Sequence, residues 1–161
     1  MNSNTETAFF KTPLGVAKII GDENGISKIS IQDNGEITER IPAVLEEVVH
    51  QLQDYFEGKR TDFDFKINPK GTEFQQKVWQ SLIEIPFGKT MSYLDLSKKL
   101  GDVKAIRAVA SANGKNPLWI VVPCHRVIGT DGSLTGYAGG LWRKKWLLEH
   151  ENLARKQELL F

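Results

Sequence analysis

The sequence has only one cysteine, Cys124, among its 161 residues. A single thiol cannot form an internal disulfide, and a zinc site built from several cysteines is excluded for the same reason. We therefore expect no disulfide, no metal and no other cofactor. Cys124 must be either a small buried hydrophobic residue or a reactive nucleophile.

Long apolar runs are also missing, since no segment has the length that is needed to cross a bilayer. The N-terminal residues Met1–Glu6 are polar and lack the basic region and apolar core of a secretory signal. We expect a cytoplasmic protein without membrane contacts.

Strong net charge is a third absence, because the whole chain carries only +1. The charge is unevenly distributed, with −4 over residues 1–70 and +5 over residues 71–161. An excess of positive charge in the second part favours an anionic partner such as DNA, although many solvated surfaces have a similar balance. The length and the hydrophobic content of 40% fit a globular protein of one or two small domains.

The first 68 residues have the pattern of a small α/β domain. Pro42 begins an amphipathic helix that ends at Gly58, and we expect it to cover a sheet. Alternation around Phe63 and Phe65 predicts one more half-buried strand over residues 62–66. Segments rich in β-branched and aromatic residues predict the antiparallel strands of that sheet: 7–11, 15–20 and 26–32.

From residue 71 onward the pattern is mainly helical. Thr72 and Gln75 have the spacing of a capping box and begin an amphipathic helix. Two short helices, predicted over 92–100 and 104–113, are joined by a glycine-containing turn, which is typical of a helix-turn-helix. A last helix is predicted over 140–152. Because Asn68-Pro69-Lys70-Gly71 interrupts the pattern, we place a domain boundary there and expect domains over 1–68 and 71–155.

The helix predicted over 104–113 surrounds one long basic side chain, Arg107, with small residues. One interpretation is that the small side chains pack tightly in the core. The other is that they allow a close approach to an external surface, and the residues alone leave both open. The small residues are Ala105, Ala108, Ala110, Ser111 and Ala112.

Cys124 follows an apolar run, residues 118–122, which predicts a buried strand that holds the thiol rigidly. A nucleophilic cysteine reacts as a thiolate and needs a base that accepts its proton. His125 is the next residue. Adjacent side chains on an extended strand point to opposite sides, so we expect a bridging water between the two.

A base of this kind needs a third group that orients its ring. The last predicted helix offers two carboxylates, Glu149 and Glu151, and the spacing does not choose between them. His150 lies between them as a rival base, although a histidine near the C-terminus of a helix more often interacts with the helix dipole or solvent.

The run Pro123-Cys124-His125-Arg126-Val127 resembles the active-site signature of the O6-alkylguanine-DNA alkyltransferases. The resemblance extends over residues 71–151, whereas residues 1–68 resemble the family only in their sheet-plus-helix pattern, which implies a structural, ribonuclease-H-like α/β domain. Further matching pieces occur in the family's order: Gly71-Thr72-Glu73-Phe74-Gln75, Ile85-Pro86-Phe87-Gly88, Ser92-Tyr93, Arg107-Ala108-Val109, Asn116-Pro117, Gly136-Tyr137, Gly139-Gly140 and Trp146-Leu147-Leu148-Glu149-His150-Glu151.

The resemblance implies DNA repair by transfer of an alkyl group from O6-alkylguanine, and also O4-alkylthymine, to Cys124 in a single irreversible turnover. It makes His125 the water-relayed base and Glu151, not Glu149, the acid that orients it. Tyr93 matches a tyrosine that contacts the target phosphate and protonates the departing guanine. Lys144 matches a basic residue of the active site.

The resemblance also implies a monomer that binds double-stranded DNA and extrudes the damaged nucleotide. Arg107 matches a finger that fills the vacated space in the duplex, and Ala105, Ala108 and Ser111 fit against the minor groove. Asn116 matches an asparagine that braces the cysteine turn, and we expect Arg126 to be structural. The residues that we expect to wall the alkyl pocket are Tyr137, Ala138, Gly139 and Gly140.

Two other classes of protein are rivals to this interpretation. Alkyltransferase-like proteins bind alkylated bases without catalysis and lack the cysteine, so Cys124 argues against them. A cysteine hydrolase with a Cys-His-Glu set would turn over, and it would need neither an arginine finger nor a helix-turn-helix.

Overall fold

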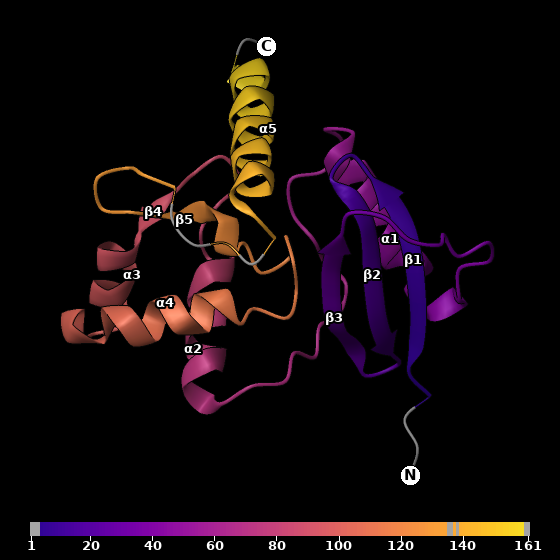
Figure 1. Cartoon of the computed structure of the whole chain (residues 1–161), viewed down its shortest axis with the longest axis horizontal. Coiled ribbons are helices and arrows are strands. Elements are labelled where there is room, and N and C mark those ends of the chain that lie inside the picture. The colour runs from indigo at the N-terminus through magenta and orange to yellow at the C-terminus, as the bar shows by residue number, and fades with distance from the viewer. Residues whose placement is uncertain (1–3, 135–136, 138, 160–161) are drawn as a thin grey trace. The chain divides into compact units, whose positions relative to one another are not determined.

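The computed structural model describes residues 4–134, 137 and 139–159, and it divides the chain into two compact units (Figure 1). The first unit contains residues up to Lys70 together with Pro117–Trp119, and the second contains Gly71–Asn116 and the chain from Ile120 onward. No helix in the described part of the chain has both the length and the apolar character that would let it cross a membrane.

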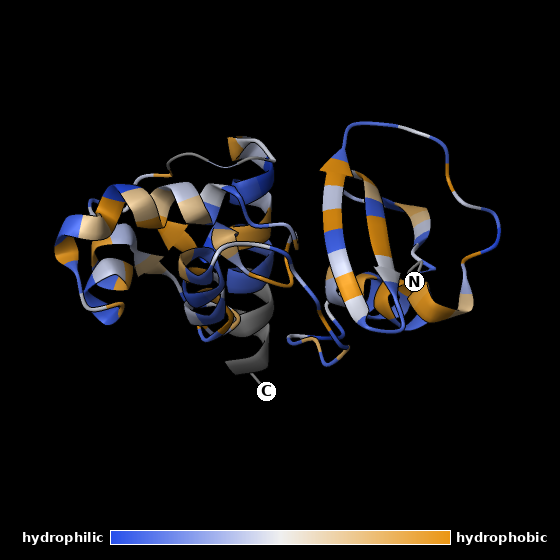
Figure 2. Cartoon of the chain, turned by 90° about the horizontal axis from the view of Figure 1, so that it is seen from below, coloured by the Kyte–Doolittle hydropathy of each residue, from blue (hydrophilic) through white to orange (hydrophobic). Residues whose placement is uncertain are grey.

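The first unit is a three-stranded antiparallel sheet in the order β1-β2-β3, with the helix α1 packed against it. Apolar and polar residues alternate along the strands, as Figure 2 shows, so that one face of the sheet is buried. This confirms the predicted sheet and helix. Their bounds are β1 Glu6–Thr12, β2 Gly15–Asp22, β3 Gly25–Gln32 and α1 Ala43–Phe56.

The strand predicted over residues 62–66 is absent from the structure, which has only an isolated bridge between Ile26 and Ile67 there. The side chain of Gln51 on α1 holds this segment instead, because its Oε1 accepts a hydrogen bond from the backbone of Asp64. Phe63 packs its ring against Tyr55 at 5.6 Å between centroids. The predicted alternation of exposure is present without a strand, and the backbone of this segment pairs with β3 only at its end, where the amide of Ile26 donates to the carbonyl of Lys66.

The second unit is mainly helical. Thr72 and Gln75 form the predicted capping box at the start of α2, and Ser92 caps α3. Gly101, with a φ of +92°, lies in the turn between α3 and α4, where a residue with a side chain would be strained. The elements are α2 Glu73–Ile83, β4 Met91–Ser92, α3 Tyr93–Lys99, the 3-10 turn Val103–Ala105, α4 Ile106–Gly114, the 3-10 turn Cys124–Arg126, β5 Val127–Ile128 and α5 Leu141–Leu159.

The apolar run at 118–122 is buried but is not a strand, so this prediction was wrong. Leu118 makes one isolated bridge with Ile29 of β3, and the backbone amide of Trp119 donates to the carbonyl of Ile29. The chain then turns at Ile120, whose φ of +71° is rare for a β-branched residue. Hydrophobic residues indicated burial correctly, but the run supplies Leu118 and Trp119 to one unit and the following residues to the other.

Candidate active site

Cys124 opens a 3-10 turn, Cys124–Arg126, instead of continuing an extended strand as predicted. Its backbone amide donates to the carbonyl of Val122, which also accepts a 2.6 Å hydrogen bond from the side chain of Asn116. The turn is therefore braced from residues before it. Cys124 is only 7% exposed, and His125 is completely buried.

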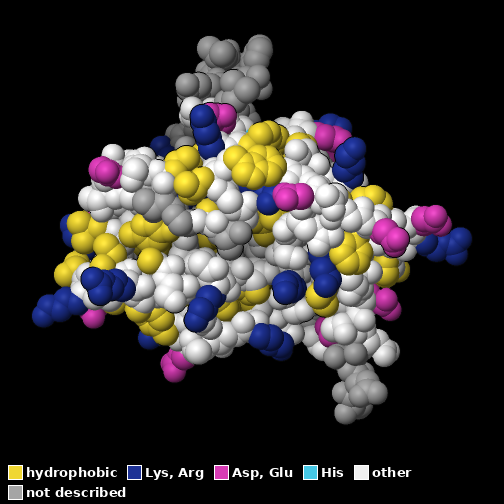
Figure 3. All heavy atoms as spheres, viewed as in Figure 1, with side chains coloured by type: hydrophobic (Ala, Val, Ile, Leu, Met, Phe, Trp, Pro, Cys, Tyr) yellow, Lys and Arg dark blue, Asp and Glu magenta, His cyan; other side chains and the backbone are white. Residues whose placement is uncertain are grey.

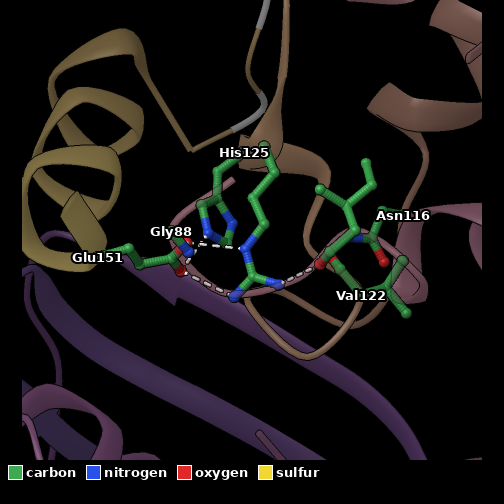
Figure 4. A network of polar contacts seen from close by, with 7 residues as sticks. Gly88, Asn116, Val122, His125 and Glu151 are labelled. Carbon is green, nitrogen blue, oxygen red and sulfur yellow. Dashed lines mark hydrogen bonds and ion pairs between the residues drawn. The ribbon is translucent and has the colours of Figure 1, made fainter. Parts of the chain in front are cut away.

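The ring of His125 is held by Glu151 of α5. Nε2 lies 2.7 Å from Oε2 of the carboxylate, and Figure 4 shows Glu151 reaching from the helix toward the ring. The other ring nitrogen, Nδ1, is buried and has no hydrogen-bond partner among the described residues. Burial lowers the pKa of His125 despite the nearby carboxylate. A neutral imidazole with Nε2–H directed at Glu151 has its basic lone pair on Nδ1.

The two rival groups on α5 lie elsewhere. The carboxylate of Glu149 is exposed, and its Oε1 lies 4.0 Å from Nζ of Lys145. The ring of His150 stacks on the ring of Trp146, with 4.9 Å between centroids. Glu151 shares the buried face of the helix with Lys144 and Leu147, at spacings of three and four residues. That spacing is a signal in the sequence that distinguishes Glu151 from Glu149.

Glu151 has a second cationic partner. Arg126 donates from Nε to Oε1 at 2.8 Å and from Nη2 to Oε2 at 3.0 Å, and its Nη1 donates to the carbonyl of Ile85. Burial alone would raise the pKa of Glu151, but His125 and Arg126 hold it well below its usual range. Glu151 is therefore ionised at neutral pH, and Arg126 lies beside it as an ion-pair partner.

The groups around the Cys124 thiol have opposing effects on its pKa. Burial raises the pKa of Cys124, while the side chain of Asn116, the charge of Lys144 and the side chain of Tyr137 lower it. Lys144 is fully buried, and its Nζ donates a 2.6 Å hydrogen bond to the carbonyl of Val127. A buried thiol with a net raised pKa is protonated at rest, so nucleophilic attack requires a base.

Tyr93 is tied to the cysteine turn by a short parallel ladder that sequence reasoning did not find. Met91 pairs with Val127 and Ser92 with Ile128, directly before Tyr93 and directly after the turn. The hydroxyl oxygen of Tyr93 accepts a 3.2 Å hydrogen bond from the side chain of Asn113 on α4.

Most of the small residues in and just before α4 are not part of the core, although Ala112 is buried. Arg107, Ala108 and Ser111 are exposed and Ala105 is half-buried, whereas Val109 is fully buried. Core packing therefore does not explain most of the small residues of this helix. Figure 3 shows Lys and Arg side chains over the α3–α4 part of the surface. The exposed basic residues of these elements include Lys98, Lys99, Lys104 and Arg107.

The loop expected to wall the pocket ends in a turn in which the amide of Gly140 donates to the carbonyl of Tyr137. Gly140 has a φ of +93°, which favours glycine. Arg143, which sequence reasoning missed, donates to the carbonyl of Gly139 and stacks on the ring of Trp142 at 4.6 Å. The predicted wall residue Ala138 lies outside the described residues.

The two parts of the chain match two descriptions of one protein family. Residues 7–69 match its ribonuclease-like domain, and residues 73–153 match its DNA-binding domain. The chain belongs to the 6-O-methylguanine DNA methyltransferase family. This confirms the family resemblance and the expected fold class, an α/β domain followed by a mainly helical domain. Membership in this family argues against the cysteine hydrolase.

Relatives and solved structures agree with this assignment. A methylated-DNA--protein-cysteine methyltransferase of Methanosarcina acetivorans is 44% identical, with 89% of this chain and 96% of the relative covered. The crystal structure of the O6-methylguanine methyltransferase of Mycobacterium tuberculosis is 39% identical with a TM-score of 0.84, covering 93% of this chain and 94% of the other. A second structure from that organism, in complex with DNA, is 40% identical with a TM-score of 0.84, covering 92% and 93%.

Proposed function

We propose that this chain repairs O6-methylguanine in DNA by transferring the methyl group to Cys124. The observation that carries the proposal is the buried set in which Glu151 orients His125 and Lys144 acts on the Cys124 thiol, in a chain of this family. O4-alkylthymine is a second substrate of the same chemistry, because its alkyl group is also carried by an exocyclic oxygen.

The reaction begins with removal of the thiol proton. His125 accepts it at Nδ1 through a water, and the resulting imidazolium is stabilised by the Glu151 carboxylate, which remains ionised. The Cys124 thiolate then attacks the methyl carbon in line with the C–O6 bond, which breaks and leaves its electron pair on guanine. Tyr93 donates a proton to the departing base. The product is a thioether, which water does not readily cleave, so each molecule acts once.

Access to the buried thiol requires the damaged nucleotide to leave the duplex. An O6-alkyl group inside stacked DNA cannot reach a cysteine that is 7% exposed. We propose that α4 and the 3-10 turn before it lie against the minor groove with Ala105, Ala108 and Ser111 at the contact, while Arg107 fills the vacated space. Phosphate contacts from the basic residues of α3 and α4 then supply affinity that does not depend on sequence.

Intact-mass measurement after exposure to duplex DNA containing O6-methylguanine tests this proposal. The expected result is one added methylene per molecule, located on the peptide that carries Cys124, with no further turnover when the substrate is in excess. Cys124→Ala should gain no mass while it still binds the duplex. Repeated turnover, or a gain of mass in Cys124→Ala, would contradict the proposal. Hydrolysis of a labelled ester by the wild-type chain would support the cysteine hydrolase instead.

A further inference from the structure

Asn113 is a buried polar residue near the C-terminal end of α4 that the proposed reaction does not yet use. It is 2% exposed and shares the buried face of the helix with Val109 and Ala112. Its side-chain nitrogen donates to the hydroxyl oxygen of Tyr93 at 3.2 Å, and the two residues are twenty positions apart on different helices. Its Oδ1 is buried without a hydrogen-bond partner among the described residues, so the contact with Tyr93 is the one that offsets part of the cost of burying this amide.

The direction of this hydrogen bond has a chemical consequence. An amide nitrogen can only donate, so the contact occupies a lone pair of the phenol oxygen and does not use the phenol's own hydrogen. A donor directed at the same oxygen also stabilises the phenolate that forms when the hydrogen leaves. Asn113 therefore favours Tyr93 as a proton donor.

The position of Asn113 is rigidly fixed. The carbonyl of the preceding residue, Ala112, accepts a 2.9 Å hydrogen bond from the indole of Trp79 on α2. The carbonyl of Asn113 itself accepts from the amide of Asn116, the residue that braces the cysteine turn. Tyr93 is fixed from the other side by the β4–β5 ladder.

We propose that Asn113 is a positioning residue that aims the Tyr93 hydroxyl at the departing guanine and makes it a better proton donor. The proposal rests on the function proposed above. As the Cys124 sulfur–carbon bond forms and the carbon–O6 bond breaks, the negative charge on guanine is neutralised by the Tyr93 proton. The phenolate that remains is stabilised by the Asn113 N–H and recovers its proton from solvent.

The test compares two reactions of Cys124 that differ in the leaving group. Transfer from free O6-benzylguanine releases guanine, which needs a proton, whereas alkylation by methyl iodide releases iodide, which does not. In Asn113→Leu the first rate should fall about tenfold, a part of the 10² to 10⁴ that general acid catalysis contributes. The methyl iodide rate should stay within about twofold of the wild type, because the thiol and its base are unchanged.

Asn113→Asp gives a second arm, because a carboxylate accepts where the amide donates. It should bind the phenol hydrogen and lose more guanine-leaving activity than Asn113→Leu, again with the methyl iodide rate preserved. Val109→Ala, a buried change on the same helix, is the control and should leave the ratio of the two rates unchanged. Thermal melts confirm that each variant is folded.

An unchanged ratio of the two rates in Asn113→Leu would overturn the positioning role. Both rates falling by the same factor would give Asn113 a purely structural role. An Asn113→Asp variant with the activity of the wild type would also overturn the proposal. If the wild-type chain transferred no methyl group from DNA, the proposed function itself would fail, and this result is distinct from the others.

Discussion

Arg126 and Glu151 form a two-bonded ion pair that is almost completely buried, with N–O distances of 2.8 and 3.0 Å. Removing one charge from such a pair leaves the other buried and uncompensated. The pair therefore governs stability as well as the orientation of His125, and the two effects can be measured separately.

Glu151→Gln should lower the free energy of unfolding at neutral pH by roughly 3–5 kcal/mol, because Arg126 keeps its buried charge. The pKa of Glu151 is lower in the folded chain than its unfolded value near 4.3, so its stabilisation is full above that pH and is lost as the pH falls below it. Urea denaturation at pH 7 and at lower pH checks both points. The exposed Glu149→Gln is the matched control, and an equal cost there would refute this account.

Lys144→Met should make the Cys124 thiol harder to ionise. The ammonium group of Lys144 lowers the pKa of Cys124, so its loss should move the pH dependence of alkylation by iodoacetamide toward alkaline pH and reduce the rate at neutral pH. Lys145→Met, at an exposed position one residue further, should leave the profile unchanged. An unchanged profile in Lys144→Met would show that the buried ammonium does not act on the thiol.

Arg107→Ala should impair repair of duplex DNA more than reaction with free O6-benzylguanine, because only the duplex requires the place of the extruded nucleotide to be filled. Single-turnover rates on both substrates give the comparison. Lys115→Ala removes an exposed basic residue just after the same helix and should affect duplex repair less. Equal losses on both substrates in Arg107→Ala would mean that Arg107 does not act through the duplex.

O6-benzylguanine should inactivate the wild-type chain, because the loop that we expect to wall the pocket has Ala138 and Gly139, which leave room for a flat ring. Trp142 is 55% exposed and is stacked on Arg143, and a Cβ added at Gly140 would lie 3.4 Å from Cδ1 of its ring. Preincubation with the benzyl compound followed by a methyl-transfer assay measures the effect. Gly139→Trp should block benzyl transfer and spare methyl transfer. Full methyl transfer by the preincubated wild type would show a closed pocket.

Short-range sequence signals predicted most of the helices, strands and turns of this protein. The capping box at Thr72, the alternation along the strands and the glycine-containing turn after α3 act over a few residues, and the structure contains each of them. The same kind of signal was wrong for residues 118–122, because hydrophobicity reports burial but not backbone direction. The contribution of Pro117–Trp119 to the first unit depends on pairing with β3, almost ninety residues earlier.

The sequence by itself determined the chemistry, because a lone cysteine beside a histidine, in a run that matches a known active site, restricts the reactions that the chain can perform. Only the tertiary structure decided the contacts through which other groups act on that pair. It brought the Glu151 carboxylate within 2.7 Å of His125, placed the Lys144 ammonium near the thiol and joined Asn113 to Tyr93. These contacts link residues that are 20 to 26 positions apart, and their geometry depends on how whole helices pack, which short-range patterns do not encode.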